Sequence, residues 1–173
     1  MEKKIDLNQI QLLILDVDGV MTDGGIIIHS DGVESKRFCV FDGHRIRMWH
    51  RAGHTSAIIS GRQCEATEIR AKQLGVPYVF QGCTQKLPVY ESLLCQLGLL
   101  PEQTAYIGDD LMDMPLVRRA GFGVAVANAV DELKQVADWT TTRCGGDGAV
   151  GETIEYILKQ TGQWESLMER YRV

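Results

Sequence analysis

Long apolar runs are absent from this sequence of 173 residues. No run approaches the ~20 apolar residues that a membrane-spanning helix needs, so we expect no membrane partner. The segment 1–6 also lacks the apolar core of a secretory signal peptide. Repeats, low-complexity segments and long linkers are missing as well. A single domain over residues 1–173 is therefore the simplest organisation.

The sequence also has no excess of positive charge and no paired cysteine motif. The formal net charge is -5 and the calculated pI is about 5.4, which does not indicate a nucleic-acid partner. The five cysteines are scattered, and none forms a CxxC or a zinc-binding pattern. We therefore expect reduced thiols in a cytoplasmic protein.

Short apolar segments alternate with segments of helical periodicity along the whole chain. Hydrophobic residues make up 45% of the sequence, enough for a sizeable core. Strands are expected at 12–15, 55–59, 78–80, 104–107 and 123–126, and helices at 42–52, 64–74, 86–97, 130–137 and 149–159. Asp42 is a good N-cap for the first of these helices. The alternation predicts an α/β fold with a doubly wound, mainly parallel sheet.

Two segments stand outside this alternation. Residues 24–40 are expected to form a β-hairpin, because residues 26–29 and 35–40 flank the turn Ser30-Asp31-Gly32. Its three successive isoleucines are hard to bury in a small domain, and a subunit interface would cover them. The tail 161–173 has apolar residues at helical spacing, and it either packs on a neighbouring subunit or reaches a neighbour's active site.

The stretch around Asp16 and Asp18 carries the clearest chemical signal. The apolar run 12–15 is typical of a strand buried on both faces, and the two acids follow it one residue apart. One carboxylate can attack phosphorus, while the other can act as general acid and base. Two acids this close also favour a divalent cation. The structural alternative is a turn cap beside a solvent-exposed Asp.

Three further strand ends or helix starts carry polar residues of complementary chemistry. Ser60 and Gly61 follow the second strand, and a hydroxyl with a backbone N–H can hold phosphate oxygens. Lys86 begins a helix and can both bind phosphate and screen Asp16. Asp109 and Asp110 follow the fourth strand and offer the oxygen ligands that suit Mg²⁺. For Asp113, two interpretations are equally supported: an acid that stabilises the first turn of a helix, or a functional group of the site.

The order of these elements resembles the motif set of the haloacid dehalogenase superfamily of phosphohydrolases. The resemblance implies that Asp16 is the nucleophile, that Asp18 is the general acid/base, and that Ser60 and Lys86 complete the catalytic set. It also implies that Mg²⁺ is held by the Asp16 carboxylate, the Asp18 backbone carbonyl and Asp109, with Asp110 nearby. The transition state would be stabilised mainly by positioning and charge.

The spacing of the motifs leaves no room for a cap domain. The chain resembles the capless branch of the superfamily that includes the 3-deoxy-D-manno-octulosonate 8-phosphate phosphatases, through DVDGVMTDGG, SGR and AYIGDDLMDMPLV. This family implies a tetramer, a location in the cytoplasm, a sugar-acid phosphate as substrate and a role in lipopolysaccharide biosynthesis. Its substrate-side positions fall on Asp18, Asp42, Gly43, Arg47, Gly61, Arg62, Arg70 and Lys86.

The chain departs from the octulosonate phosphatases at Phe41 and Asp147, where those enzymes carry arginine. Asp147 would repel a carboxylate-bearing substrate if it pointed into the site. A sialic-acid-type nonulosonate 9-phosphate is therefore the alternative substrate. The alternative of another class is a non-catalytic regulatory partner of a sugar-activating enzyme. The presence of both Asp16 and Asp18 argues against that second reading.

Overall fold

The sheet has its first strand at the centre. The computed structural model describes residues 3–172. The strand order is β5-β4-β1-β6-β7-β8, and each neighbouring pair is parallel. The strands are β1 Leu12–Leu15, β4 Thr55–Ile59, β5 Tyr78–Phe80, β6 Thr104–Gly108, β7 Phe122–Ala125 and β8 Trp139–Thr140. After β1, the chain adds β4 and β5 on one side of it and then crosses to the other side, where it adds β6, β7 and β8. This confirms the doubly wound α/β fold.

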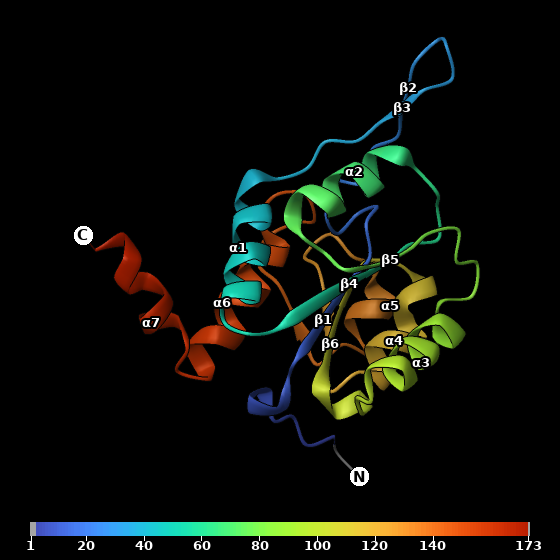
Figure 1. Cartoon of the computed structure of the whole chain (residues 1–173). Helices are drawn as coiled ribbons and strands as arrows, with labels where there is room; N and C mark the ends of the chain where they lie inside the picture. Colours follow the sequence, from blue (N-terminus) through green and yellow to red (C-terminus); the bar gives the residue numbers. More distant parts are fainter. Residues whose placement is uncertain (1–2, 173) are drawn as a thin grey trace.

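Helices cover both faces of the sheet. One group contains α1, α2 and α6, and the other contains α3, α4 and α5 (Figure 1). Their bounds are α1 Val40–Arg51, α2 Glu65–Leu74, α3 Lys86–Leu97, α4 Met114–Arg119, α5 Asp131–Lys134, α6 Ala149–Gln160 and α7 Trp164–Met168. All four residues of β1 are fully buried between these layers, as their unbroken apolar run predicts. Between residues 3 and 172 there is no separate cap domain.

The start of α1 differs from the prediction. The helix begins at Val40, with Cys39 in the N-cap position, so Asp42 is not its cap. Instead, the Asp42 carboxylate accepts a 2.7 Å hydrogen bond from the backbone N–H of Gly151. Gly151 lies in the first turn of α6, where backbone donors lack partners within the helix. Asp42 therefore caps a helix that is distant in sequence, and it is buried there.

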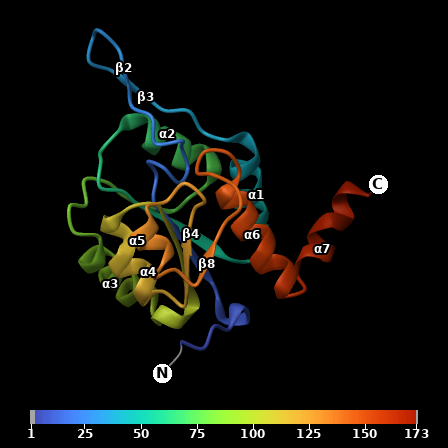
Figure 2. The same cartoon turned by 180° about the vertical axis from the view of Figure 1, so that it is seen from behind.

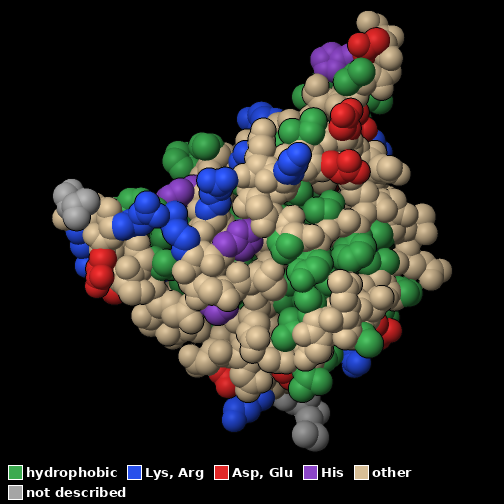
Figure 3. Space-filling view, in the orientation of Figure 1, with side chains coloured by type: hydrophobic (Ala, Val, Ile, Leu, Met, Phe, Trp, Pro, Cys, Tyr) green, Lys and Arg blue, Asp and Glu red, His purple; other side chains and the backbone are tan. Residues whose placement is uncertain are grey.

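The hairpin exists, but its paired segments are shorter than expected. Strands β2 Ile27–Ile28 and β3 Glu34–Ser35 pair antiparallel, and the hairpin extends away from the body of the molecule (Figure 1). Ile28 is 69% exposed, and Ile26, Ile27 and Val33 are also exposed. Figure 3 shows hydrophobic side chains along this projection, next to acidic ones. The residues beyond Ser35 run without regular structure into α1 rather than continuing the strand.

The tail is helical and lies against its own chain. After α7, a 3₁₀ turn spans Glu169–Tyr171. The Trp164 ring faces the cationic groups of Arg45 and Lys159, at 5.5 and 4.9 Å from its centroid. The Tyr171 hydroxyl is hydrogen-bonded to His44 on α1. Figure 2 shows the tail beside α1 and α6, with its end directed away from the sheet. None of the helices between residues 3 and 172 has the length and apolar character that a bilayer crossing requires.

Candidate active site

Polar side chains gather at the carboxyl ends of the parallel strands. Asp16 directly follows β1, Ser60 follows β4, and Asp109 follows β6. Carboxyl ends of parallel strands meet at one edge, and ligands bind there where the strand order reverses. A cavity of about 230 Å³ at this edge is lined by Asp16, Asp18, Gly24, Ser60, Gly61, Arg62, Lys86, Asp109, Asp110, Met112 and Asp113. The structure thus brings eight of the predicted site residues together: Asp16, Asp18, Ser60, Gly61, Arg62, Lys86, Asp109 and Asp110.

Lys86 is the buried cation of this cavity. Its ammonium lies 2.9 Å from Asp16 Oδ1 and 2.7 Å from Asp113 Oδ1, and its side chain is only 3% exposed. Burial by itself lowers the pKa of Lys86, but the neighbouring Asp16 and Asp113 outweigh it and raise the pKa above its ordinary value. The group therefore stays charged at neutral pH and lies where it can screen Asp16.

Asp113 is fully buried and combines the two roles that its sequence position left open. Its Oδ1 also accepts a 2.6 Å hydrogen bond from the Tyr106 hydroxyl. Its Oδ2 accepts hydrogen bonds from the backbone N–H groups of Asp109 and Asp110, at 2.9 and 3.3 Å. Asp113 thus fixes the loop after β6 and also holds Lys86. Its spacing of four residues from Asp109 was the only sequence signal for this function.

Asp16 and Asp109 are carboxyl groups that resist ionisation without a further cation. Burial, and then the charge of Asp113, raise the pKa of Asp16 to about 7, although Lys86 opposes this. Burial, and then the charges of Asp16 and Asp113, raise the pKa of Asp109 to about 8. A divalent cation between the two groups would relieve both desolvation and repulsion.

The donor set fits Mg²⁺. Carboxylate oxygens of Asp16, Asp109 and Asp113 lie within 4.8 Å of one another. Asp113 already accepts from several donors, so Asp16 and Asp109 are the carboxylates with capacity left. A Cβ on Gly19 would lie 1.9 Å from Asp109 Oδ2, so only glycine lets Asp109 approach the peptide that carries the Asp18 carbonyl. Hard oxygen ligands of this kind suit Mg²⁺.

The remaining cavity residues lie around this acidic centre. Asp110 is exposed at the rim, and its Oδ1 accepts from the backbone N–H of Leu111 at 2.7 Å. The Ser60 hydroxyl is buried and accepts a 3.4 Å hydrogen bond from the backbone N–H of Arg62. Gly61 lies beneath Met112, whose Cε would be 3.4 Å from a Cβ at that position. The Ser60–Gly61 turn can therefore present a hydroxyl and backbone donors to an anion in the cavity.

Four predicted substrate-side residues do not line the acidic cavity. Asp42 and Gly43 are buried in α1, and a Cβ on Gly43 would lie 2.4 Å from Arg70 Nη2. The Arg70 Nη2 donates to the Cys39 carbonyl at 3.4 Å. The Arg47 Nη2 donates to the Gln73 carbonyl at 2.7 Å. Contact of these four residues with substrate stays a prediction.

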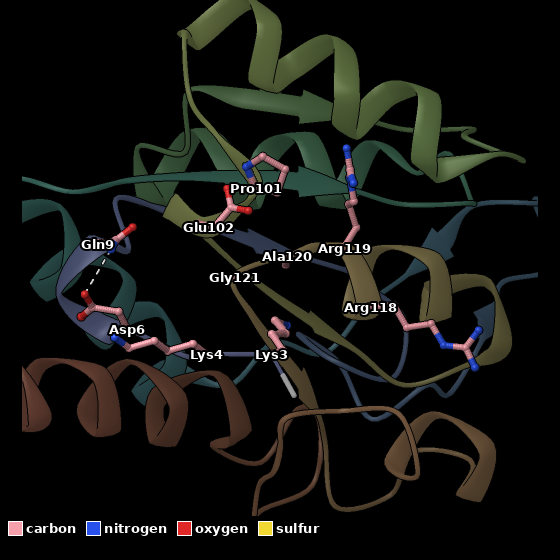
Figure 4. Close-up of a pocket in the computed structure, with 10 residues that line it drawn as sticks. All are labelled: Lys3, Lys4, Asp6, Gln9, Pro101, Glu102, Arg118, Arg119, Ala120 and Gly121. Carbon is pink, nitrogen blue, oxygen red and sulfur yellow. Dashed lines mark hydrogen bonds between the residues drawn. The ribbon is translucent and has the colours of Figure 1, made fainter. Parts of the chain in front are cut away.

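A second cavity, of about 310 Å³, lies at the opposite edge of the sheet (Figure 4). It is lined by residues that precede β1, β6 and β7, among them Lys4, Glu102 and Gly121. Figure 4 shows Arg118 and Arg119 pointing in different directions. Since none of the strand-end acids reaches this cavity, we place the chemistry at the carboxyl edge.

The comparisons with known proteins agree with this geometry. The family model described as haloacid dehalogenase-like hydrolase matches residues 79–154. The 3-deoxy-D-manno-octulosonate 8-phosphate phosphatase KdsC of Escherichia coli K12 is 43% identical over 154 residues, 89% of this chain and 82% of the relative. The enzyme of the same name from Yersinia pestis is 46% identical over 149 residues, 86% of this chain and 80% of the relative.

A solved structure of high similarity contains ligands. The 3-deoxy-D-manno-octulosonate 8-phosphate phosphatase from Moraxella catarrhalis, in complex with a magnesium ion, a phosphate ion and a KDO molecule, superposes with a TM-score of 0.94. It is 40% identical, and the match covers 95% of each chain. Together with the strand-end acids and the buried lysine, these similarities show that the chain belongs to the 3-deoxy-D-manno-octulosonate 8-phosphate phosphatase family of the haloacid dehalogenase superfamily.

Proposed function

We propose that this protein is a Mg²⁺-dependent phosphatase that hydrolyses 3-deoxy-D-manno-octulosonate 8-phosphate to the free sugar acid and phosphate. The observation that carries the proposal is the cavity in which Lys86 pairs with Asp16, while Asp18 lies at the rim and Asp109 has no ionic partner among residues 3–172. This arrangement provides a nucleophile, a separate acid/base and a metal ligand. High identity to enzymes of that activity supports the substrate.

The residues divide a two-step reaction between them. The Asp16 carboxylate attacks phosphorus and forms an aspartyl-phosphate, while Asp18 protonates the departing sugar oxygen. Asp18 then removes a proton from the water that hydrolyses this intermediate. Lys86 and the Ser60–Gly61 turn hold the phosphoryl oxygens in line.

The metal would be held by the Asp16 and Asp109 carboxylates and by the Asp18 carbonyl. When bound there, Mg²⁺ would supply positive charge that neutralises phosphoryl oxygens and keeps both carboxylates ionised. Asp110 would lie close to this site without being held by another charged side chain of the described chain. The raised pKa values of Asp16 and Asp109 support this assignment, because such carboxylates gain most from a cation.

The specificity for an octulosonate has support at the cavity itself. The Arg62 guanidinium lies at the rim, where it can meet a sugar-acid carboxylate. Asp147 does not line the acidic cavity within the described chain, so its negative charge does not oppose that contact there. Phe41 is exposed and lines another cavity, beside α1 and α6.

We also propose a homotetramer in the cytoplasm, with a role in lipopolysaccharide biosynthesis. The exposed hairpin isoleucines support self-association, because a second copy of the chain would remove their apolar surface from water. The five cysteines are all free thiols in the structure, which fits a reducing compartment.

Phosphate release from a panel of sugar phosphates tests the function. The panel contains octulosonate 8-phosphate, a nonulosonate 9-phosphate and a neutral hexose phosphate, each with and without Mg²⁺. We expect the highest kcat/KM for octulosonate 8-phosphate and no turnover by Asp16→Asn. A preference for the nonulosonate would refute the substrate, and turnover by Asp16→Asn would refute the nucleophile.

A further inference from the structure

A buried lysine at the base of the hairpin contacts an acid at the rim of the acidic cavity. Lys36 lies just after β3, and its side chain is only 2% exposed. Its ammonium is paired with Asp18 Oδ1 and lies 3.0 Å from Glu34 Oε1. A buried ammonium is costly unless it is paired, so this side chain is held in place by its two acids.

Glu34 extends the contact into a ring of alternating charges. Its Oε2 accepts a 2.6 Å hydrogen bond from Arg62 Nη2. The Arg62 Nε lies 3.7 Å from Asp18 Oδ2. Two cations and two anions thus connect three chain segments: the loop after β1, the hairpin base and the loop after β4. Each side chain in the ring is restrained by charges on both sides.

The two oxygens of Asp18 are in different situations. Oδ1 is paired with Lys36, whereas Oδ2 is buried and has no hydrogen-bond partner among residues 3–172. An acid/base must keep one oxygen free to carry the transferred proton, while its carboxylate plane stays fixed. The ring meets both conditions: Lys36 restrains Oδ1, while Oδ2 has only the longer ionic contact with Arg62 and no hydrogen bond, so it keeps capacity for the proton.

We propose that Lys36, held by Glu34, is a positioning residue for the general acid/base Asp18. The inference deepens the phosphatase function proposed above and rests on it. As the bond between phosphorus and the sugar oxygen breaks, the proton on Asp18 Oδ2 moves to that oxygen. Water later returns a proton to the same atom as its oxygen attacks the aspartyl-phosphate. Lys36 exchanges no proton; it fixes the direction in which Oδ2 faces.

The experiment uses the dependence of the first chemical step on the leaving group. A sugar alcohol needs protonation to depart, whereas p-nitrophenolate is a stable anion that does not. In single-turnover experiments with Lys36→Met, we expect release of the sugar alcohol to slow by about 10- to 100-fold, part of the ~10²–10⁴-fold that a positioned acid contributes. Release of p-nitrophenolate should change by less than about 3-fold, since it does not draw on that acid.

Two variants serve as controls. Arg37→Met removes a neighbouring hairpin cation whose side chain is 73% exposed and paired with Asp23, and it should leave both rates unchanged. Lys36→Arg keeps the charge and should recover most of the lost rate with the sugar phosphate. Thermal unfolding of each variant checks the fold. If Lys36→Met does not fold, Glu34→Gln is measured in its place, since it removes one anion that holds Lys36.

An equal loss with both substrates, or no loss with either, would overturn the inference. Complete inactivity of the wild-type protein on every phosphate ester would instead overturn the proposed function. If the wild-type protein hydrolyses another alkyl phosphate in preference to octulosonate 8-phosphate, the leaving-group comparison is made with that ester. The experiment therefore distinguishes a failure of the positioning role of Lys36 from a failure of the proposed function or substrate.

Discussion

Replacing Asp16, the proposed nucleophile, by its neutral isostere is expected to stabilise the metal-free protein while it abolishes turnover. Asp16 lies in a cavity where burial and the charge of Asp113 disfavour its ionised form. Asp16→Asn removes that charge and changes the side-chain volume little. Lys86 keeps its 2.7 Å contact with Asp113, so the substitution leaves no buried cation without a partner.

The size of the effect follows from the pKa of Asp16, which rises from 3.8 to about 7 on folding. A raised carboxyl pKa destabilises the fold as the group ionises; this cost is absent below pH 3.8, grows as the pH rises, and is complete above pH 7. The difference of roughly three pKa units corresponds to about 4 kcal/mol at pH 8, at ~1.4 kcal/mol per unit. At pH 5 the carboxyl is mostly protonated in the fold, and the cost is about 2 kcal/mol.

Thermal unfolding in a chelator provides the assay. At ~2–4 °C per kcal/mol for a chain of this size, Asp16→Asn should raise the Tm by roughly 10 °C at pH 8 and roughly 5 °C at pH 5. Saturating Mg²⁺ should reduce or reverse the difference, because the wild-type site binds the cation more tightly and gains stability from it. Asp131→Asn is the control, since its side chain is 89% exposed. A variant that is no more stable than the wild type at pH 8 without metal would refute the reasoning.

Three further substitutions and conditions test other parts of the site. Lys86→Met should lower the free energy of unfolding by about 3–5 kcal/mol, because it leaves Asp113 buried without its cation, and it should also weaken phosphate inhibition; an unchanged inhibition constant would remove Lys86 from the phosphate site. Mg²⁺ should bind more tightly at pH 8 than at pH 6, because the raised pKa values of Asp16 and Asp109 make its binding compete with protons. Isothermal titration calorimetry checks this, and equal affinities would contradict the assignment. Ile28→Lys should shift sedimentation toward smaller species by charging the hairpin surface, and an unaltered profile would exclude that surface from assembly.

Much of the fold could be predicted because the apolar residues of each strand segment indicate by themselves that the strand is buried. The run 12–15 has no polar residue, and it forms the fully buried central strand. The strand β8 was missed because it consists of two residues that pair only with β7. The start of α1 was misplaced because Asp42 caps α6, and no local pattern reveals a contact across 109 residues of sequence.

The site was predictable to the extent that its residues directly follow strands. Parallel strands bring their carboxyl ends to one edge, so Asp16, Ser60 and Asp109 had to lie near one another. The hairpin residues had no such constraint. Lys36 contacts Asp18 from the irregular segment that follows β3, and its position in the chain resembles that of an exposed hairpin lysine. Arg47, in contrast, lies on α1, and its guanidinium donates a hydrogen bond to the Gln73 carbonyl of α2.

Four acids of one chemical type are suited to different proposed roles because their surroundings differ. Asp113 has both oxygens occupied by donors and serves as a fixed anion. Asp16 has one cation, Lys86, and keeps capacity for a metal and for phosphorus. Asp18 has one oxygen restrained by Lys36 and a second that makes no hydrogen bond among the described residues, which suits an acid/base. Asp109 has no ion pair among the described residues and has the higher of the two raised pKa values, so it has the greatest need of Mg²⁺. The differences in charge environment therefore support Asp109 as the proposed metal ligand.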